Sequence, residues 1–66
     1  MKLFEYAVII HPSKQEKEAG TKSKLLVPPT HVLAHDLNAA TVVASRAIPE
    51  ENIADLDRIE VAVRPF

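Results

Sequence analysis

Three histidines, His11, His31 and His35, are the residues of this chain whose side chains most readily bind a metal ion or move a proton. His31 and His35 are four residues apart and Asp36 follows them, a spacing that on one helix could hold zinc. Two prolines before them and the helix-capping Asp36 after them instead predict an extended segment, in which their backbones lie about 13 Å apart. We therefore expect surface histidines and no metal site.

Serine and phosphate chemistry have less support. Ser13 and Ser23 flank a polar segment and Ser45 falls within a predicted helix, so none occupies the strand–turn–helix elbow of a nucleophilic serine. A single glycine rules out a glycine-rich phosphate loop. We expect no catalytic residue, no cofactor and no enzymatic activity.

Paired carboxylates are the remaining catalytic candidates. Glu5 and Glu60 are candidate neighbours on the outer face of a sheet, and two carboxylates do acid–base chemistry where a cleft shifts their pKa values. An open sheet face supplies no such cleft. We expect them instead to pair with Arg58 or Arg64 in solvent, where ion pairs contribute little to stability.

Size and composition limit the function classes. A chain of 66 residues forms one domain and buries only about 60% of its unfolded surface, so stability is marginal without help. It has no cysteine, which excludes disulfides and thiolate metal sites and leaves an oligomer or a larger assembly as the expected support. We expect a protein partner or a homo-oligomer.

Charge and hydropathy exclude further classes. The net charge is -1 and the pI about 6.3, whereas a nucleic-acid binder of this size is normally basic. The lysines between residues 14 and 24 are diluted by Glu16 and Glu18, so nucleic-acid binding is not expected. No apolar run spans a bilayer, and Glu5 interrupts the first one, so we expect neither a membrane span nor a signal peptide.

Hydrophobic periodicity predicts three strands and one helix. Residues 3–10 are apolar on both faces, which indicates a central strand. Residues 24–35 form an edge strand broken by two prolines. A helix at 37–48 begins after the N-cap Asp36 and ends at Pro49, and 50–57 form a connection anchored by Ile53 and Leu56.

The last strand shows the clearest alternation: Ile59, Val61 and Val63 face one way and charged residues the other. With a right-handed crossover, the fold class is α+β, a β-β-α-β chain whose three-stranded sheet has the order 2-1-3 and one helix on one face. Residues 1–66 form a single domain with a mobile loop at 13–23. The expected core is Phe4, Tyr6, Val8, Leu37, Ala40, Ala44, Ile48, Ile59, Val61 and Val63.

One helix covers only one face of this sheet, so the other face stays apolar. A contiguous apolar patch on a small domain usually marks a contact surface, and edge strands also offer unpaired backbone groups. The alternative is scattered apolar residues that the 13–23 loop covers. We expect a protein–protein interface formed by Leu3, Ala7, Ile9, Ala62 and Phe66.

Three segments together resemble small proteins of tailed bacteriophages, most of unassigned function. They are residues 4–12 (FEYAVIIHP), 44–50 (ASRAIPE) and 56–66 (LDRIEVAVRPF). The resemblance implies a phage setting, in which small chains often serve as virion parts or host-directed binders. We expect a non-enzymatic accessory protein of the phage particle, a minor capsid or virion component. A small module that binds or inhibits a host protein is the alternative. The implied location is the virion or the host cytoplasm.

Overall fold

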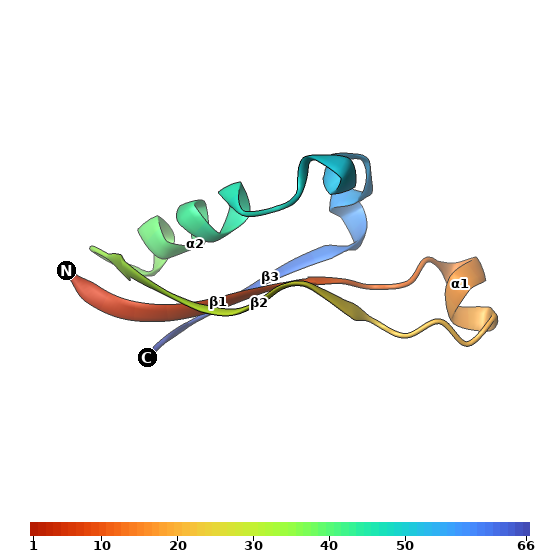
Figure 1. Ribbon diagram of the computed structural model, residues 1–66, viewed down its shortest axis with the longest axis horizontal. Coiled ribbons are helices and arrows are strands. Elements are labelled where there is room, and N and C mark those ends of the chain that lie inside the picture. The colour runs from red at the N-terminus through yellow and green to blue at the C-terminus, as the bar shows by residue number, and fades with distance from the viewer.

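A three-stranded antiparallel sheet with one helix against it forms the fold, and the computed structural model describes residues 1–66 (Figure 1). The strands are β1 (Lys2–Ile10), β2 (Lys24–Ala34) and β3 (Ile59–Pro65). Their order is β2-β1-β3, with β1 antiparallel to both neighbours. The predicted α+β class and strand order are confirmed.

The two prolines of β2 deform the strand without ending it. Tyr6 pairs with Thr30, but Val8 pairs with Val27, so one residue of register is lost across the prolines and another just beyond. An extra residue on one strand is a β-bulge, which an edge strand tolerates because its second side needs no partner. The predicted break is therefore a pair of irregularities in a continuous strand.

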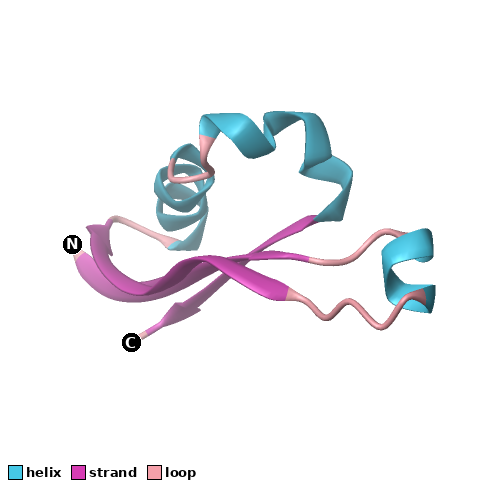
Figure 2. Ribbon diagram, turned by 45° about the vertical axis from the view of Figure 1, so that its right-hand side comes forward, coloured by secondary structure: helices cyan, strands magenta, loops and turns pink.

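Helix α2 (Leu37–Arg46) covers one face of the sheet (Figure 2). As predicted, Asp36 is its N-cap, and its Oδ1 accepts a hydrogen bond of 2.8 Å from the backbone N–H of Ala39. The helix ends two residues earlier than predicted. Ile48 and Pro49 then lead into the 3₁₀ segment η1 (Glu50–Arg58), which is kinked at Asp55.

The core is small. Five residues are buried, namely Phe4, Val8, Ala34, Ala40 and Ala44. Four of them were predicted and Ala34 was missed; the other predicted strand residues and Ile48 are only partly buried.

Three apolar residues lie further out than predicted. Leu37 is 49% exposed, because the small Ala40 and Ala44 bring the helix backbone close to the sheet and a longer side chain beside them projects past the contact. Ile53 and Leu56 are each about half exposed, so they do not anchor η1. None of the helices has both the length and the apolar character that a membrane span requires.

The polar segment at 13–23 contains a helix that was not predicted, α1 (Lys14–Glu18). Ser13 Oγ accepts from the backbone N–H of Glu16, and the Glu16 carboxylate accepts from the N–H of Ser13, which makes a complete capping box. None of the residues of α1 is buried. The helix lies beyond the end of the sheet, in a molecule measuring 43 × 20 × 15 Å (Figure 1).

Candidate interface on the outer face of the sheet

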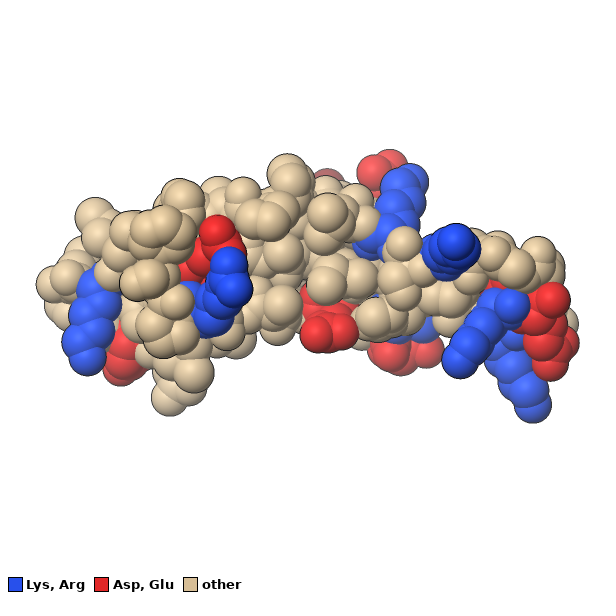
Figure 3. Space-filling view, turned by 90° about the horizontal axis from the view of Figure 1, so that it is seen from below, with Lys and Arg blue, Asp and Glu red and all other residues tan.

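The outer face is the side of the sheet opposite α2. Strand register places on it the odd-numbered residues of β1 and their partners: Leu3 opposite Leu33, Ala7 opposite Ala62, and Ile9 between Leu25 and Glu60. Seen from that side, most of the surface is uncharged, with charged side chains in small groups of mixed sign (Figure 3).

The five residues predicted for the interface share this face. Leu3 and Phe66 are 40% and 70% exposed, whereas Ala7, Ile9 and Ala62 are partly covered by their neighbours. The 13–23 segment does not cover them, because it continues past the end of the sheet (Figure 1). The alternative in which this loop shields the apolar residues is therefore wrong. Their use as a contact surface remains a prediction.

Two further apolar residues of the outer face were missed. Leu25 and Leu33 are 53% and 60% exposed and lie opposite Ile9 and Leu3. They come from the two halves of β2, on either side of its prolines. The two register shifts together restore the alternation, so both leucines face outward. The sequence signal was a leucine on each side of the proline pair. Whether the two leucines share a face depended on the bulges between them.

Glu5 forms the polar centre of this apolar face. Its Oε1 accepts a hydrogen bond of 2.9 Å from Nε of Arg64 and lies 2.6 Å from Nη2 of the same residue, and its Oε2 lies 3.4 Å from Nε2 of His31. These groups come from all three strands, since Glu5 lies opposite Arg64 on β3 and His31 on β2. The Glu5 side chain is only 17% exposed, so its neighbours shelter it from water.

The predicted pairing of Glu5 with Arg64 is correct, but its proposed proximity to Glu60 is wrong. Glu60 lies opposite Ile9, four residues along β1, and binds His11. Arg58 pairs with Glu16 and Asp55 instead. The two carboxylates therefore do not form a pair that could share a proton.

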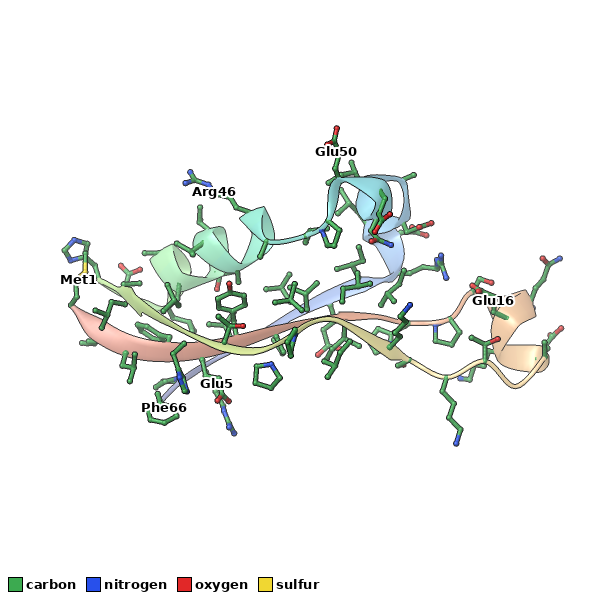
Figure 4. The ribbon with its side chains drawn as sticks, viewed as in Figure 1. Met1, Glu5, Glu16, Arg46, Glu50 and Phe66 are labelled. Atoms are coloured by element: carbon green, nitrogen blue, oxygen red, sulfur yellow. The ribbon has the colours of Figure 1, made fainter.

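Phe66 closes one end of this cluster. Its backbone N–H donates to the carbonyl of Leu3 at 3.0 Å, and its ring meets that of His31 edge-on, with centroids 4.3 Å apart. The labelled Glu5 and Phe66 lie on the side of the sheet away from Arg46 and Glu50, which project from the helical side (Figure 4). An aromatic ring beside a mostly covered carboxylate suits protein recognition, where apolar area gives affinity and polar groups give specificity.

A shallow hollow adjoins the Glu5–Arg64 pair. It has a volume of about 260 Å³ and is lined by Glu5, Ala7, Pro29, Ala62, Val63 and Arg64.

A second polar cluster connects the polar segment 13–23, the arm that carries α1, with β3. His11 lies between Ser23 Oγ, 2.8 Å from its Nδ1, and Glu60 Oε1, 2.8 Å from its Nε2. A serine, an imidazole and a carboxylate in a row form the nucleophilic chain of many hydrolases, which works in sites shielded from water. Here the His11 and Glu60 side chains are 46% and 55% exposed. We interpret these three hydrogen-bonded side chains as a clamp that holds the two ends of the arm against β3.

Arg58 strengthens the same clamp. Its Nη1 donates to Glu16 at 2.6 Å and to the carbonyl of His11 at 3.2 Å, and its Nη2 lies 3.1 Å from Asp55. Hydrogen bonds from the backbone and side chain of Ser13, and the nearby Arg58 charge, lower the pKa of Glu16 below its ordinary value of 4.5. The hydrogen bond to Asp55, and the charges of Asp55 and Glu16, raise the pKa of Arg58.

The three histidines have different surroundings. His31 contacts Glu5 and Phe66, His11 belongs to the clamp, and His35 is exposed just before α2. No group of three or more potential metal ligands lies together.

Comparison with known proteins adds no family to this picture. No protein-family model matches the chain, and no curated protein or solved structure matches it either.

Proposed function

We propose that this chain is a non-enzymatic binding domain that acts through protein–protein contacts of its outer sheet face. The observation that carries the proposal is the set of exposed apolar side chains on that face, around the Glu5–Arg64 ion pair. They are Leu3, Leu25, Leu33 and Phe66, with exposed fractions of 40% to 70%. A sheet face this apolar is normally covered, and α2 covers only the other side.

The small core supports the same conclusion. Val8 is the only fully buried large side chain, and two of the five buried residues lie in β1. A chain with so little buried apolar surface has a narrow margin of stability, because burial must outweigh the loss of chain entropy. Covering the outer face with a partner would add to the buried area. The structure is therefore suited to a component of an assembly.

Following its resemblance to small proteins of tailed phages, we propose that the assembly is a phage particle. The chain would then be a minor capsid or virion accessory protein. The alternative is a small module that binds or inhibits a host protein through the same face. Both functions use the same surface, and they differ in where the protein accumulates.

Quantitative mass spectrometry of purified phage particles and of the infected-cell lysate tests the proposal. A virion component is enriched in particles relative to the lysate and keeps a fixed ratio to the major capsid protein. A protein found only in the lysate contradicts the virion proposal and supports the host-directed module. Binding studies with the outer-face variants described in the Discussion then show whether this surface is used.

A further inference from the structure

β3 has a free edge that can hydrogen-bond. It is the last strand of the sheet on its side. The hydrogen bonds at its two ends, from Phe66 N–H to Leu3 O and from His11 N–H to Arg58 O, fix the alternation of the ladder with β1. By that alternation the backbone groups of Val61 and Val63 point away from β1. An edge strand with such groups is a template for another strand.

We propose that β3 pairs antiparallel with β3 of a second copy, about a two-fold axis through Ala62. The residues at equal distances from Ala62 are chemically complementary. Glu60 would lie opposite Arg64 of the second copy, and Val61 opposite Val63 of the second copy. Each copy thus supplies one negative and one positive side chain to its partner, and opposite charges at directly facing positions stabilise strand pairs.

The same register also matches the backbone. Val61 and Val63 are the residues whose N–H and C=O point outward, and in this register they face each other across the interface. The N–H of Ile59 already donates to the carbonyl of Leu56, and Pro65 has no N–H, so neither limits the pairing. Four hydrogen bonds would form, two on each side of the axis.

The neighbouring registers lack this complementarity. A two-fold axis through Val61 would place Arg64 opposite Arg58 of the second copy, which sets like charges against each other. An axis through Val63 would separate Glu60 from Arg64. A register shifted by one residue would place Val61 and Val63 opposite residues whose backbone groups point toward β1. The two-fold axis through Ala62 therefore gives the only one of these registers that satisfies both the charges and the hydrogen bonds.

The charged atoms required are accessible. Glu60 binds His11 through Oε1, and its side chain is 55% exposed. Arg64 binds Glu5 through Nε and Nη2, and its side chain is 73% exposed. The Oε2 of Glu60 and the Nη1 of Arg64 take no part in those contacts. Pairing would therefore extend the existing ion pairs without breaking them.

The two-fold axis would stand perpendicular to the sheet, so both α2 helices would lie on one face and both outer faces on the other. The result is a six-stranded sheet with one continuous outer face. This inference does not depend on the proposed function, since it rests on the backbone edge of β3, although Glu60 and Arg64 also lie on the outer face.

Sedimentation and isotope-filtered NMR on the full chain test the pairing. Sedimentation over micromolar to millimolar concentration should show a particle of twice 7.3 kDa. In a mixture of labelled and unlabelled chains, Ala62 Hα should show an intermolecular NOE to its own counterpart, since these atoms approach closely in a non-hydrogen-bonded antiparallel pair. The amides of Val61 and Val63 should be protected from exchange only in the dimer. A chain that stays monomeric, or a dimer whose Val61 and Val63 amides remain unprotected, overturns the proposal.

A charge exchange tests the register. Glu60→Arg should weaken dimerisation about tenfold, because the new arginine at position 60 of each copy then faces Arg64 of the other copy. Arg64→Glu should do the same by opposing two glutamates. An equimolar mixture of the two variants should restore dimerisation as a heterodimer, since every facing pair is then complementary. Glu51→Arg, an exposed change of the same charge in η1, is the control. Unchanged dimerisation in folded Glu60→Arg overturns the register, and this variant alone suffices if Arg64→Glu does not fold.

Discussion

The ring of Phe66 reaches from the end of β3 to the imidazole of His31 on β2, although β1 lies between these two strands. The centroids are 4.3 Å apart and the planes are at 73°, an edge-to-face geometry. Glu5 on β1 lies close to the same imidazole. The contact therefore connects the two edge strands across the central strand β1, on the outer face of the sheet.

Replacing Phe66 by alanine should release the His31 ring. The ring-proton resonances of His31 should shift in an NMR spectrum, because the ring current of the neighbouring phenyl group is lost. Thermal stability should change little, since the phenyl side chain is 70% exposed. Phe66→Leu, which keeps an apolar group without a ring current, should give the same shift. Unchanged His31 resonances in both variants would show that the contact does not form in solution.

The Glu5–Arg64 pair should contribute measurable coupling energy. In a double-mutant cycle with Glu5→Gln and Arg64→Ala, urea denaturation should give a coupling of about 0.5–1 kcal/mol. The value is at the upper end for surface pairs because the Glu5 carboxylate is mostly covered, accepts a hydrogen bond from Nε of Arg64 and lies 2.6 Å from its Nη2. Glu51→Gln combined with Arg64→Ala is the uncoupled control. A coupling indistinguishable from that control would mean that the ion pair is absent or fully screened.

Removing the capping hydroxyl of Ser13 should loosen α1 alone. Ser13→Ala should raise amide exchange in residues 14–19 about fivefold, because the N–H of Glu16 loses its acceptor. The free energy of global unfolding should be unchanged within experimental error, since α1 contributes no buried side chain. Ser13→Thr should retain protection. If Ser13→Ala lowered global stability as much as a core substitution, the separation of the arm from the core would be wrong.

The order of the arm should depend on acid pH. The pKa of Glu16 is lower in the folded chain than its ordinary value of 4.5, so the ionised carboxylate stabilises the arm above that pH. The stabilisation should fall away as the pH drops below 4.5 through the lowered pKa. Amide shifts of residues 14–18 followed by NMR titration should show this midpoint. Arg58→Gln should move it upward, toward 4.5, because the neighbouring positive charge is lost. A midpoint at or above 4.5 in the unsubstituted chain would contradict the capping geometry.

The strand order could be predicted because its signals are local and consistent. Residues 3–10 are apolar on both faces, Asp36 and Pro49 frame the helix, and Ile59, Val61 and Val63 alternate with charged residues. Each of these patterns follows from a fixed backbone period. The antiparallel order then follows from chain connectivity and handedness.

The errors arose where tertiary geometry or side-chain hydrogen bonds decide the structure. The capping box of Ser13 and Glu16 nucleates a helix in a segment with almost no apolar residue, so hydrophobic periodicity could not reveal it. Leu25 faces the same way as Leu33 because the two register shifts in β2 cancel, and no local pattern determines these shifts. The meeting of Phe66 with His31 depends on side chains crossing a third strand.

Paired charge insertions test whether the outer face of the sheet is the contact surface. Leu3→Glu places a carboxylate on the outer face, and Val42→Glu places the same group at a half-exposed site on α2. Circular dichroism would first establish that both variants fold like the unsubstituted chain. Their amount in purified particles would then be measured by mass spectrometry. If the outer face is the contact surface, Val42→Glu should be retained in the particles and Leu3→Glu should be lost from them. Retention of folded Leu3→Glu at the level of the unsubstituted chain would contradict it.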